Sequence, residues 1–307
     1  MKDDTTKLAI RIKITGVCNR TCFFCHKEDG MKDIQPVLVD RLFFLNVHSI
    51  MNHYNADRII LTEGEPTTHN KLEQIISGLC AKEITLTTNG FILLNKNEWR
   101  RLKQAGLTKA TFSIHEVNAY DIISTKLKHR SLDWCDKLLK NQILNLRNAI
   151  DAGLKVRVNS VVYSSNNKSE KILQMIDKKI GLDQVEFRLL NDLSNIVSSQ
   201  KEISKLIRRL EASIFKKYIR AGGSDETSYY HTKSKQTFST KTAKRTLLQS
   251  ICADCSMLAQ CNAGASIRIE QRKGILYVRL CILKHTSDVL IPLTVFLKNA
   301  NIVELIK

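Results

Sequence analysis

The hydrophobic and polar positions of the chain follow two alternating periods. Short apolar runs rich in β-branched residues predict strands, and apolar residues spaced by three and four predict helices between them. The predicted strands cover residues 8–15, 57–62, 83–88, 109–115, 155–163 and 184–190. The predicted helices cover residues 37–52, 70–81, 95–106, 132–152, 168–180 and 200–221. Six strand–helix pairs favour a parallel sheet, because each helix returns the chain to the start of the next strand.

This rhythm predicts an α/β fold, a partial (β/α)6 TIM-like barrel over residues 1–224. From residue 225 the rhythm stops. We predict a basic linker over residues 225–247 and a small C-terminal α+β domain over residues 248–307. The short apolar runs of that domain make a core too small to fold alone, so a bound metal cluster would help to hold it together.

Polar residues follow directly after the predicted strands. In sheets of this kind the C-terminal ends of the strands meet at one rim, where side chains from different strands converge. The residues at these positions are Cys18–Cys25, Glu63–Pro66, Asn89-Gly90, Ser113-Ile114-His115, Asn159 and Asn191-Asp192. We therefore expect the functional site at this rim.

The grouping of the nine cysteines indicates metal chemistry. No signal-type apolar run follows the charged N-terminus and no apolar stretch reaches bilayer length, so the sequence predicts a cytoplasmic protein without a membrane partner. Disulfides are rare in that reducing compartment, which favours metal ligation by clustered thiols. Cys80 and Cys135 stand alone in helical patterns and are expected to be buried small apolar residues. The other seven form two groups: Cys18, Cys22 and Cys25, then Cys252, Cys255, Cys261 and Cys281.

The first group supplies three thiolates, one fewer than a closed metal site takes. A structural zinc ion usually has four protein ligands, and His26 follows Cys25 too closely to complete such a site. Three thiolates suit a four-iron cluster in which one iron stays open. The Cys-x3-Cys-x2-Cys spacing, with Phe24 before the third cysteine, resembles the signature of the radical SAM superfamily.

That resemblance implies a mechanism. The open iron of a [4Fe–4S] cluster held by Cys18, Cys22 and Cys25 would bind S-adenosylmethionine (SAM), with Phe24 beside the cofactor. Reduction by a cellular reductant such as flavodoxin or ferredoxin would cleave SAM to methionine and a 5′-deoxyadenosyl radical, which takes a hydrogen atom from the substrate. The resemblance thus implies an enzyme of the oxidoreductase or lyase type.

Further positions between residues 8 and 192 carry the same resemblance. "TEGEP" (62–66) resembles the Gly-Gly-Glu-Pro turn of the superfamily, with Glu63 in place of the first glycine. "LTTNG" (86–90) and "FSIH" (112–115) resemble strand ends of the subfamily that includes the GTP 3′,8-cyclase. By this likeness the SAM-binding residues would be Gly64, Glu65, Asn89, Ser113, which bonds the ribose or carboxylate, and Asn159, near the adenosyl group.

The second cysteine group supplies four thiolates, which suit a closed [4Fe–4S] cluster or a structural zinc ion. The Cys-x2-Cys-x5-Cys core resembles the auxiliary-cluster segment of SPASM and twitch-type radical SAM enzymes. A twitch domain carries one such cluster. The resemblance therefore implies a second [4Fe–4S] cluster, used for electron transfer, with the ligands Cys252, Cys255, Cys261 and Cys281.

The likeness to the same subfamily also indicates which substrate to expect. Arg11 matches a family arginine that holds a triphosphate, and Arg157 stands where the family has a substrate-binding lysine. Cys255, however, precedes "SMLAQ" where the cyclase has an Arg-x-Arg pair, and the cyclase's Gly-Gly end is absent. We therefore expect a relative of the cyclase that acts on a small polar, sugar- or nucleotide-like substrate, with Arg11, His115 and Arg157 as candidate substrate residues.

The net charge of +18 leaves alternatives open. Lysines are scattered over the chain, and the densest basic run, residues 231–245, is Ser/Thr-rich, which is typical of a mobile surface segment. An anionic small substrate accounts for the charge as well as nucleic acid does. A radical SAM maturase acting on a peptide or protein is the first alternative. A zinc-ribbon protein that binds nucleic acid, favoured only by charge, is the second.

Overall fold

Six parallel strands form the middle of the sheet in the computed structural model. The structure describes residues 9–22, 24–25, 36–124, 131–163, 168–193, 195–219, 225–243, 252–256, 261, 267–281 and 289–298. The strands are β1 (Ala9–Lys13), β2 (Arg58–Thr62), β3 (Glu83–Thr88), β4 (Lys109–Ser113), β5 (Lys155–Val162) and β6 (Glu186–Asn191). They pair in sequence order. This arrangement confirms the predicted α/β fold with a partial parallel barrel.

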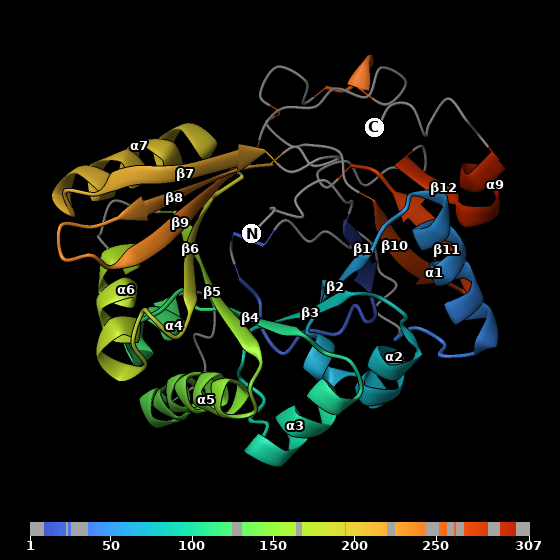
Figure 1. The fold of residues 1–307 in the computed structure, drawn as a ribbon, viewed down its shortest axis with the longest axis horizontal. Helices are drawn as coiled ribbons and strands as arrows, with labels where there is room; N and C mark the ends of the chain where they lie inside the picture. The colour runs from blue at the N-terminus through green and yellow to red at the C-terminus, as the bar shows by residue number, and fades with distance from the viewer. Residues whose placement is uncertain are drawn as a thin grey trace.

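Helices cover the outer side of the curved sheet (Figure 1). They are α1 (Arg41–His53), α2 (Leu72–Gly78), α3 (Lys96–Gln104), α5 (Leu132–Asp151) and α6 (Lys168–Lys179), with the shorter η1 (Pro66–Thr68) and α4 (Ala119–Ser124) between them. Side-chain caps fix several starts; the Asp40 carboxylate, for example, accepts from the backbone N–H of Phe43 at 2.7 Å. None of the described helices combines the length and the apolar character needed to cross a membrane.

An antiparallel meander extends the sheet beyond β6. It follows α7 (Ile196–Arg209) and consists of β7 (Ser213–Ile219), β8 (Asp225–His231) and β9 (Thr237–Ala243), with β9 parallel to β6. The helix predicted over 200–221 is confirmed as far as Arg209, and its last part is wrong, because Ser213–Ile219 form β7. The segment 225–247, predicted as a linker, contains the strands β8 and β9. Its role as a boundary between domains stays a prediction. The helix stops because Glu211 adopts a φ of 46°. The strands form because threonines and aromatic residues recur with a period of two, which the many charges concealed.

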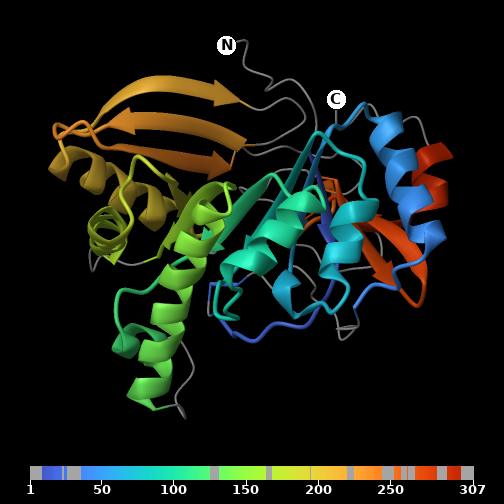
Figure 2. The ribbon, with the colours of Figure 1, turned by 60° about the horizontal axis from the view of Figure 1, so that its bottom comes forward.

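The other edge of the sheet comes from the C-terminal part of the chain, and Figure 2 shows it beside α1. Its elements are β10 (Arg268–Arg272), β11 (Ile275–Arg279), β12 (Leu290–Pro292) and α9 (Leu293–Lys298). β10 pairs in parallel with β1, and β11 and β12 follow antiparallel.

The C-terminal strands share the hydrophobic core of the barrel. Ile269, Val278 and Phe296 belong to the same buried cluster as Ile10 and Ile12 of β1. The described part of the predicted C-terminal domain is therefore an extension of the barrel sheet. Its boundary at residue 248 stays a prediction.

Asn145 of α5 holds the loop that follows β3. Its Oδ1 accepts from the backbone N–H of Leu94 at 2.8 Å and from Nε1 of Trp99 at 3.2 Å. Its Nδ2 donates to the carbonyls of Gly90 and Ile92 at 2.8 and 2.7 Å. Because Asn145 is 1% exposed, no water can replace these bonds.

We expect Asn145→Leu to lower the free energy of unfolding by about 3 kcal/mol, because the change leaves buried donors and acceptors unpaired. Urea titration would measure this loss. The control is Asn52→Leu on an exposed position of α1, which should change stability by less than about 0.5 kcal/mol. Equal effects of the two substitutions would contradict the anchoring role of Asn145.

Candidate active site

The first cysteine group lies in the loop after β1, residues 14–22 and 24–25, which we call the cysteine loop. Cys18 and Cys25 are exposed and Cys22 is half-buried. The backbone N–H of Cys25 donates to the carbonyl of Cys22 at 3.1 Å in a tight turn. Burial raises the pKa of the Cys22 thiol to about 12, although Arg20 opposes the rise, and Cys25 and Cys18 contribute to it. The three sulfur atoms therefore lie near enough to influence one another at the C-terminal end of β1.

An ion pair fastens the cysteine loop to the end of β4. Arg20, between Cys18 and Cys22, donates from Nη2 to Oε1 of Glu116. Both side chains are almost fully buried, at 3% and 0% exposure, and Arg20 also lies 5.3 Å from the ring centre of Phe91. This pair was not predicted from the sequence. The only signal for it is the position of Glu116 directly after "FSIH".

A second anchor comes from the end of β3. Nδ2 of Asn89 donates to Oδ1 of Asn19 in the cysteine loop at 2.7 Å. Gln142 of α5 holds this strand end, because its Nε2 donates to the carbonyl of Asn89 at 2.6 Å and of Ser113 at 3.3 Å. The structure thus brings the predicted residue Asn89 to the cysteine loop.

The turn after β2 packs backbone against backbone on the cysteine loop. Gly64 has a φ of 58°, and a Cβ on it would lie 2.4 Å from the carbonyl oxygen of Thr15 and 2.8 Å from that of Val17. The N–H of Glu65 donates to the same Val17 carbonyl at 2.8 Å. Only glycine allows both this left-handed conformation and this close approach.

The carboxylate of Glu65 is enclosed by protein donors. Its Oε1 accepts from the hydroxyls of Thr67 and Thr88, each at 2.6 Å, and its Oε2 accepts from the N–H of Asn89 at 2.6 Å. Burial raises its pKa, although these hydrogen bonds favour the charged form. The same carboxylate acts electrostatically on Cys18. Glu65 therefore joins the β2 turn to β3 beside the cysteines.

Three aromatic rings pack together at Phe24, the residue that precedes the third cysteine. Phe24 contacts His115 edge to face at 4.6 Å and stacks on Tyr163 at 5.3 Å. Nδ1 of His115 accepts from the N–H of Val161 at 3.1 Å, and burial with the nearby Arg20 holds the His115 pKa well below its ordinary value. His115 is therefore neutral and packs under the cysteine loop, where it is only 5% exposed.

Ser113 and Asn159 lie side by side on β4 and β5, because they are partners in the strand register. The N–H of Ile114 donates to the Asn159 carbonyl at 3.0 Å. Oδ1 of Asn159 is buried and has no hydrogen-bond partner among the described residues. A buried acceptor of this kind usually serves a ligand or ordered water.

A charged group lies inside the barrel toward the N-terminal ends of the strands. Glu186 of β6 pairs with Arg157 of β5 at 2.6 Å and Lys109 of β4 at 3.0 Å, and also with Arg188. Burial raises the pKa of Glu186, but these three cations outweigh it and hold the pKa well below its ordinary range. The structure therefore gives the predicted substrate residue Arg157 a carboxylate partner.

Arg188 links this group to a second set of charges on β9. Lys241 pairs with Asp225 of β8, and burial, with Arg11 and Arg188, lowers the Lys241 pKa to about 8. Arg11 of β1 is therefore near enough to Lys241 for its charge to lower the pKa of that amine. Among the described residues, one electrostatically linked set therefore consists of five cations, Arg11, Lys109, Arg157, Arg188 and Lys241, and two carboxylates, Glu186 and Asp225.

Glu63, which stands in place of the first glycine of the Gly-Gly-Glu-Pro turn, has a specific partner. Glu63 keeps a left-handed φ of 70°, and its Oε1 lies 3.5 Å from Nε of Arg268 on β10. The two side chains are 5% and 8% exposed. The glutamate therefore joins the turn beside the cysteine loop to the C-terminal strands.

The second cysteine group is half-buried at all four positions. The N–H of Cys255 donates to the carbonyl of Cys252 at 3.1 Å, the same turn as that of Cys22 and Cys25. Cys252 and Cys281 pack against the main hydrophobic core. Their role as ligands of one auxiliary cluster stays a prediction.

In the part of the chain that the structure describes, no three His, Cys, Asp or Glu residues are placed to hold a single metal ion. The first group offers three neighbouring thiols on an anchored loop, two of them exposed. Thiolates are the donors that iron–sulfur clusters take, so these residues suit such a group chemically.

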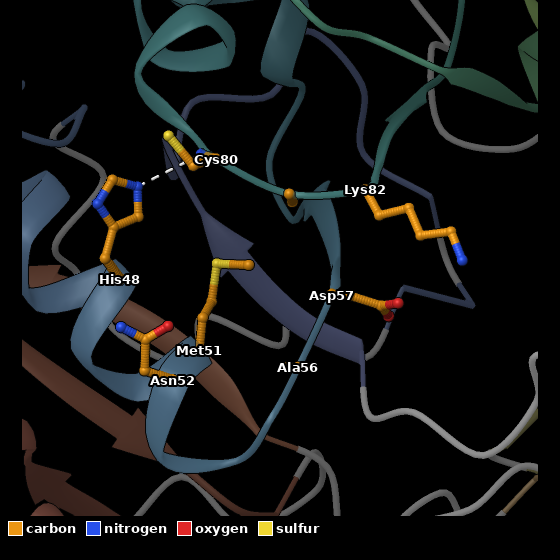
Figure 3. A pocket seen from close by; sticks show the side chains of 8 residues that line it. His48, Met51, Asn52, Ala56, Asp57, Cys80 and Lys82 are labelled. Carbon is orange, nitrogen blue, oxygen red and sulfur yellow. Dashed lines mark hydrogen bonds between the residues drawn. The ribbon is translucent and has the colours of Figure 1, made fainter.

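A pocket of about 330 Å³ lies at the opposite end of the barrel (Figure 3). His48 and Met51 of α1 line it together with Asp57 and Lys82, which directly precede β2 and β3. Cys80 also lines it and is exposed, so its predicted burial is wrong, because α2 ends at Gly78 and leaves Cys80 in a loop. Cys135 is buried, as predicted.

Sequence comparison identifies relatives of this chain. It is 31% identical over 219 residues to a protein of Saccharolobus solfataricus named "Probable GTP 3′,8-cyclase", a match that covers 65% of this chain and 67% of that protein.

Solved structures share the fold. The structure of tagged anSMEcpe with bound AdoMet has 16% identity and a TM-score of 0.50, covering 67% of this chain and 57% of that one. HydG, titled a maturase of the [FeFe]-hydrogenase, has 11% identity and a TM-score of 0.50, covering 66% and 49%. The family model described as the Radical SAM superfamily matches residues 12–177, more than half of the 307 residues. The chain therefore belongs to the radical SAM superfamily.

Proposed function

We propose that this radical SAM enzyme holds a [4Fe–4S] cluster through Cys18, Cys22 and Cys25 and acts on a small polar substrate with an anionic group. The observation that carries the proposal is the anchoring of the cysteine loop. Arg20 pairs with Glu116, and Asn19 pairs with Asn89. These contacts are made by the protein alone, so they lower the cost of ordering the cysteine ligands.

When bound, the cluster and SAM supply reductive cleavage of SAM and hydrogen-atom abstraction from the substrate. The residues of the chain would bind and orient SAM and would shield the cluster from water. Gly64 and the backbone of its turn would receive the amino group of SAM, and Ser113 with the buried Oδ1 of Asn159 would face its adenosyl part. Phe24 and its neighbouring rings would keep water from the cluster.

The substrate class rests on the charges of the interior. In the linked set of charges on β1, β4, β5, β6, β8 and β9, the five cations outnumber the two carboxylates, so an anion is favoured beside it. The name of the Saccharolobus solfataricus relative suggests GTP as the first probe. The auxiliary [4Fe–4S] cluster, with Cys252, Cys255, Cys261 and Cys281 as ligands, and an electron-donor protein complete the proposal.

Anaerobic reconstitution with iron and sulfide tests the cluster. The wild-type protein should bind iron and form 5′-deoxyadenosine from SAM with dithionite. Cys22→Ala should lose the product at least about 100-fold, because two thiolates cannot hold the cluster. Cys80→Ala, in the distant pocket, should retain it. Undiminished 5′-deoxyadenosine from Cys22→Ala, or a wild-type protein that holds zinc and leaves SAM intact, would refute the proposal.

Gly64→Ala tests the turn. Its Cβ would overlap the carbonyl oxygens of Thr15 and Val17, so the cysteine loop must shift and SAM affinity should fall at least about tenfold. Gly274→Ala is a matched control, because Gly274 has a φ of 80° with no atom within 4 Å of the added Cβ. Equilibrium dialysis with labelled SAM measures the SAM affinity of each variant. Equal affinities in the two variants would contradict the packing argument.

The pH dependence of GTP binding tests whether the charged amine of Lys241 contributes to anion binding in the barrel interior. Lys241 has a pKa lowered to about 8, so it is mostly charged at pH 7 and mostly neutral at pH 9. GTP affinity should therefore fall as pH rises through 8, by about tenfold, the worth of one charge-assisted contact. Lys241→Met should bind GTP more weakly at pH 7.5 and show a smaller pH step. Guanosine, which carries no phosphate, is the control; an equal fall in its affinity would rule out the phosphate contact.

A further inference from the structure

Gln142 is a polar residue on the buried side of α5. Its side chain is 1% exposed and lies in the same buried stripe of the helix as Cys135, Leu146 and Ala149. Burial of an amide is costly unless its donors and acceptors are paired. The Nε2 of Gln142 is paired, whereas its Oε1 has no hydrogen-bond partner among the described residues. The contribution of this side chain therefore lies in the two bonds of Nε2.

Those two bonds join the ends of two different strands. Nε2 of Gln142 donates to the backbone carbonyl of Asn89, directly after β3, at 2.6 Å, and to that of Ser113, at the end of β4, at 3.3 Å. The last register partners of β3 and β4 are Thr88 and Phe112, so the bridge lies one residue beyond them. An amide nitrogen carries two N–H donors, which allows one side chain to bind both carbonyls. Gln142 therefore fixes the spacing of the two strands at the rim.

The two bridged residues are both among those that the family resemblance assigns to SAM. Asn89 also reaches the cysteine loop, because its Nδ2 donates to Oδ1 of Asn19 at 2.7 Å. Ser113 lies beside Asn159 of β5 in the strand register. A change in the spacing of the two carbonyls would therefore displace the predicted SAM-binding groups of β3 relative to those of β4 and β5.

The other amides of α5 differ from Gln142 in their backbone partners. Asn145 binds backbone groups of residues 90–94, and Asn148 donates from Nδ2 to the carbonyl of Leu94 at 2.9 Å. These bonds hold the loop after β3, whereas those of Gln142 also reach β4. Loss of the Gln142 amide should therefore change the rim, and loss of the Asn148 amide should change only the far part of the loop.

We propose that Gln142 is a positioning residue for SAM, which sets the spacing of the β3 and β4 ends through bonds that the protein makes by itself. The inference rests on the proposed function, because it requires Asn89 and Ser113 to contact SAM. Without the bridge, part of the binding free energy of SAM would go into restoring this spacing, so the affinity falls. Once SAM is bound the spacing is restored, so the rate of SAM cleavage at saturation is retained.

The experiment compares SAM binding and SAM cleavage in the reconstituted enzyme. Gln142→Met removes both donors and keeps the length of the side chain. Gln142→Glu keeps its shape and offers at most one donor, so it covers a folding defect in the first variant. Both variants should bind labelled SAM at least about tenfold more weakly in equilibrium dialysis. Both should hold as much iron as the wild type, because neither bridged carbonyl belongs to the cysteine loop.

The kinetics of 5′-deoxyadenosine formation with dithionite separate positioning from stability. The KM for SAM should rise at least about tenfold in both Gln142 variants, while kcat should change less than about threefold. A mere loss of folded protein would instead lower kcat and leave KM unchanged. A lower kcat at unchanged KM would therefore overturn the inference.

The matched control is Asn148→Leu, which removes one amide–carbonyl bond between the same helix and the same loop. Its SAM affinity should stay within about twofold of the wild type. Wild-type affinity in folded, iron-loaded Gln142→Met and Gln142→Glu would overturn the inference, and so would an equal loss of affinity in Asn148→Leu. A wild-type protein that assembles no cluster and binds no SAM would instead refute the proposed function.

Discussion

The organisation of the site depends on how an irregular loop is held in place. The cysteine loop has no strand or helix of its own, so its position comes from side chains at neighbouring strand ends. The buried Arg20–Glu116 pair is the main fastening, because it joins the loop to β4 with both charges removed from water. Loss of either partner would leave an unpaired buried charge, which is far more costly than the pair itself. The parallel sheet matters chiefly because it brings these ends together.

In the barrel interior, too, buried charged side chains are held by partners from neighbouring strands. Charged side chains from β1, β4, β5, β6 and β9 point inward, and several of these cations pair with the same carboxylate. Glu186 alone serves Lys109, Arg157 and Arg188. A surplus of positive charge in such a space is tolerated when an anion can enter to balance it. The Glu186 carboxylate reduces that surplus, because it pairs with three of the cations at once.

The sequence was most informative where the pattern was local. The strand–helix repeat, the cysteine spacing and the "TEGEP" turn each lie within a short window, and each led to the correct element or family. Contacts between segments far apart in the sequence could not be predicted from it. Arg20 and Glu116 are 96 positions apart, and Glu63 meets Arg268 only because β10 pairs with β1. The strands β8 and β9 were missed because their threonines alternate with charges that resemble a solvated segment. The ligand roles of both cysteine groups rest on spacing and resemblance.

The pairing of β10 with β1 also has a consequence for how the chain folds. β1 is an inner strand of the finished sheet, yet its neighbour on one side is made only after residue 267 has been synthesised. Until then β1 has a free hydrogen-bonding edge, and closing so long a loop makes this step slow. The cysteine loop that follows β1 therefore belongs to a nascent barrel that is open on that side. Aggregation through this edge is the hazard that the last strands remove.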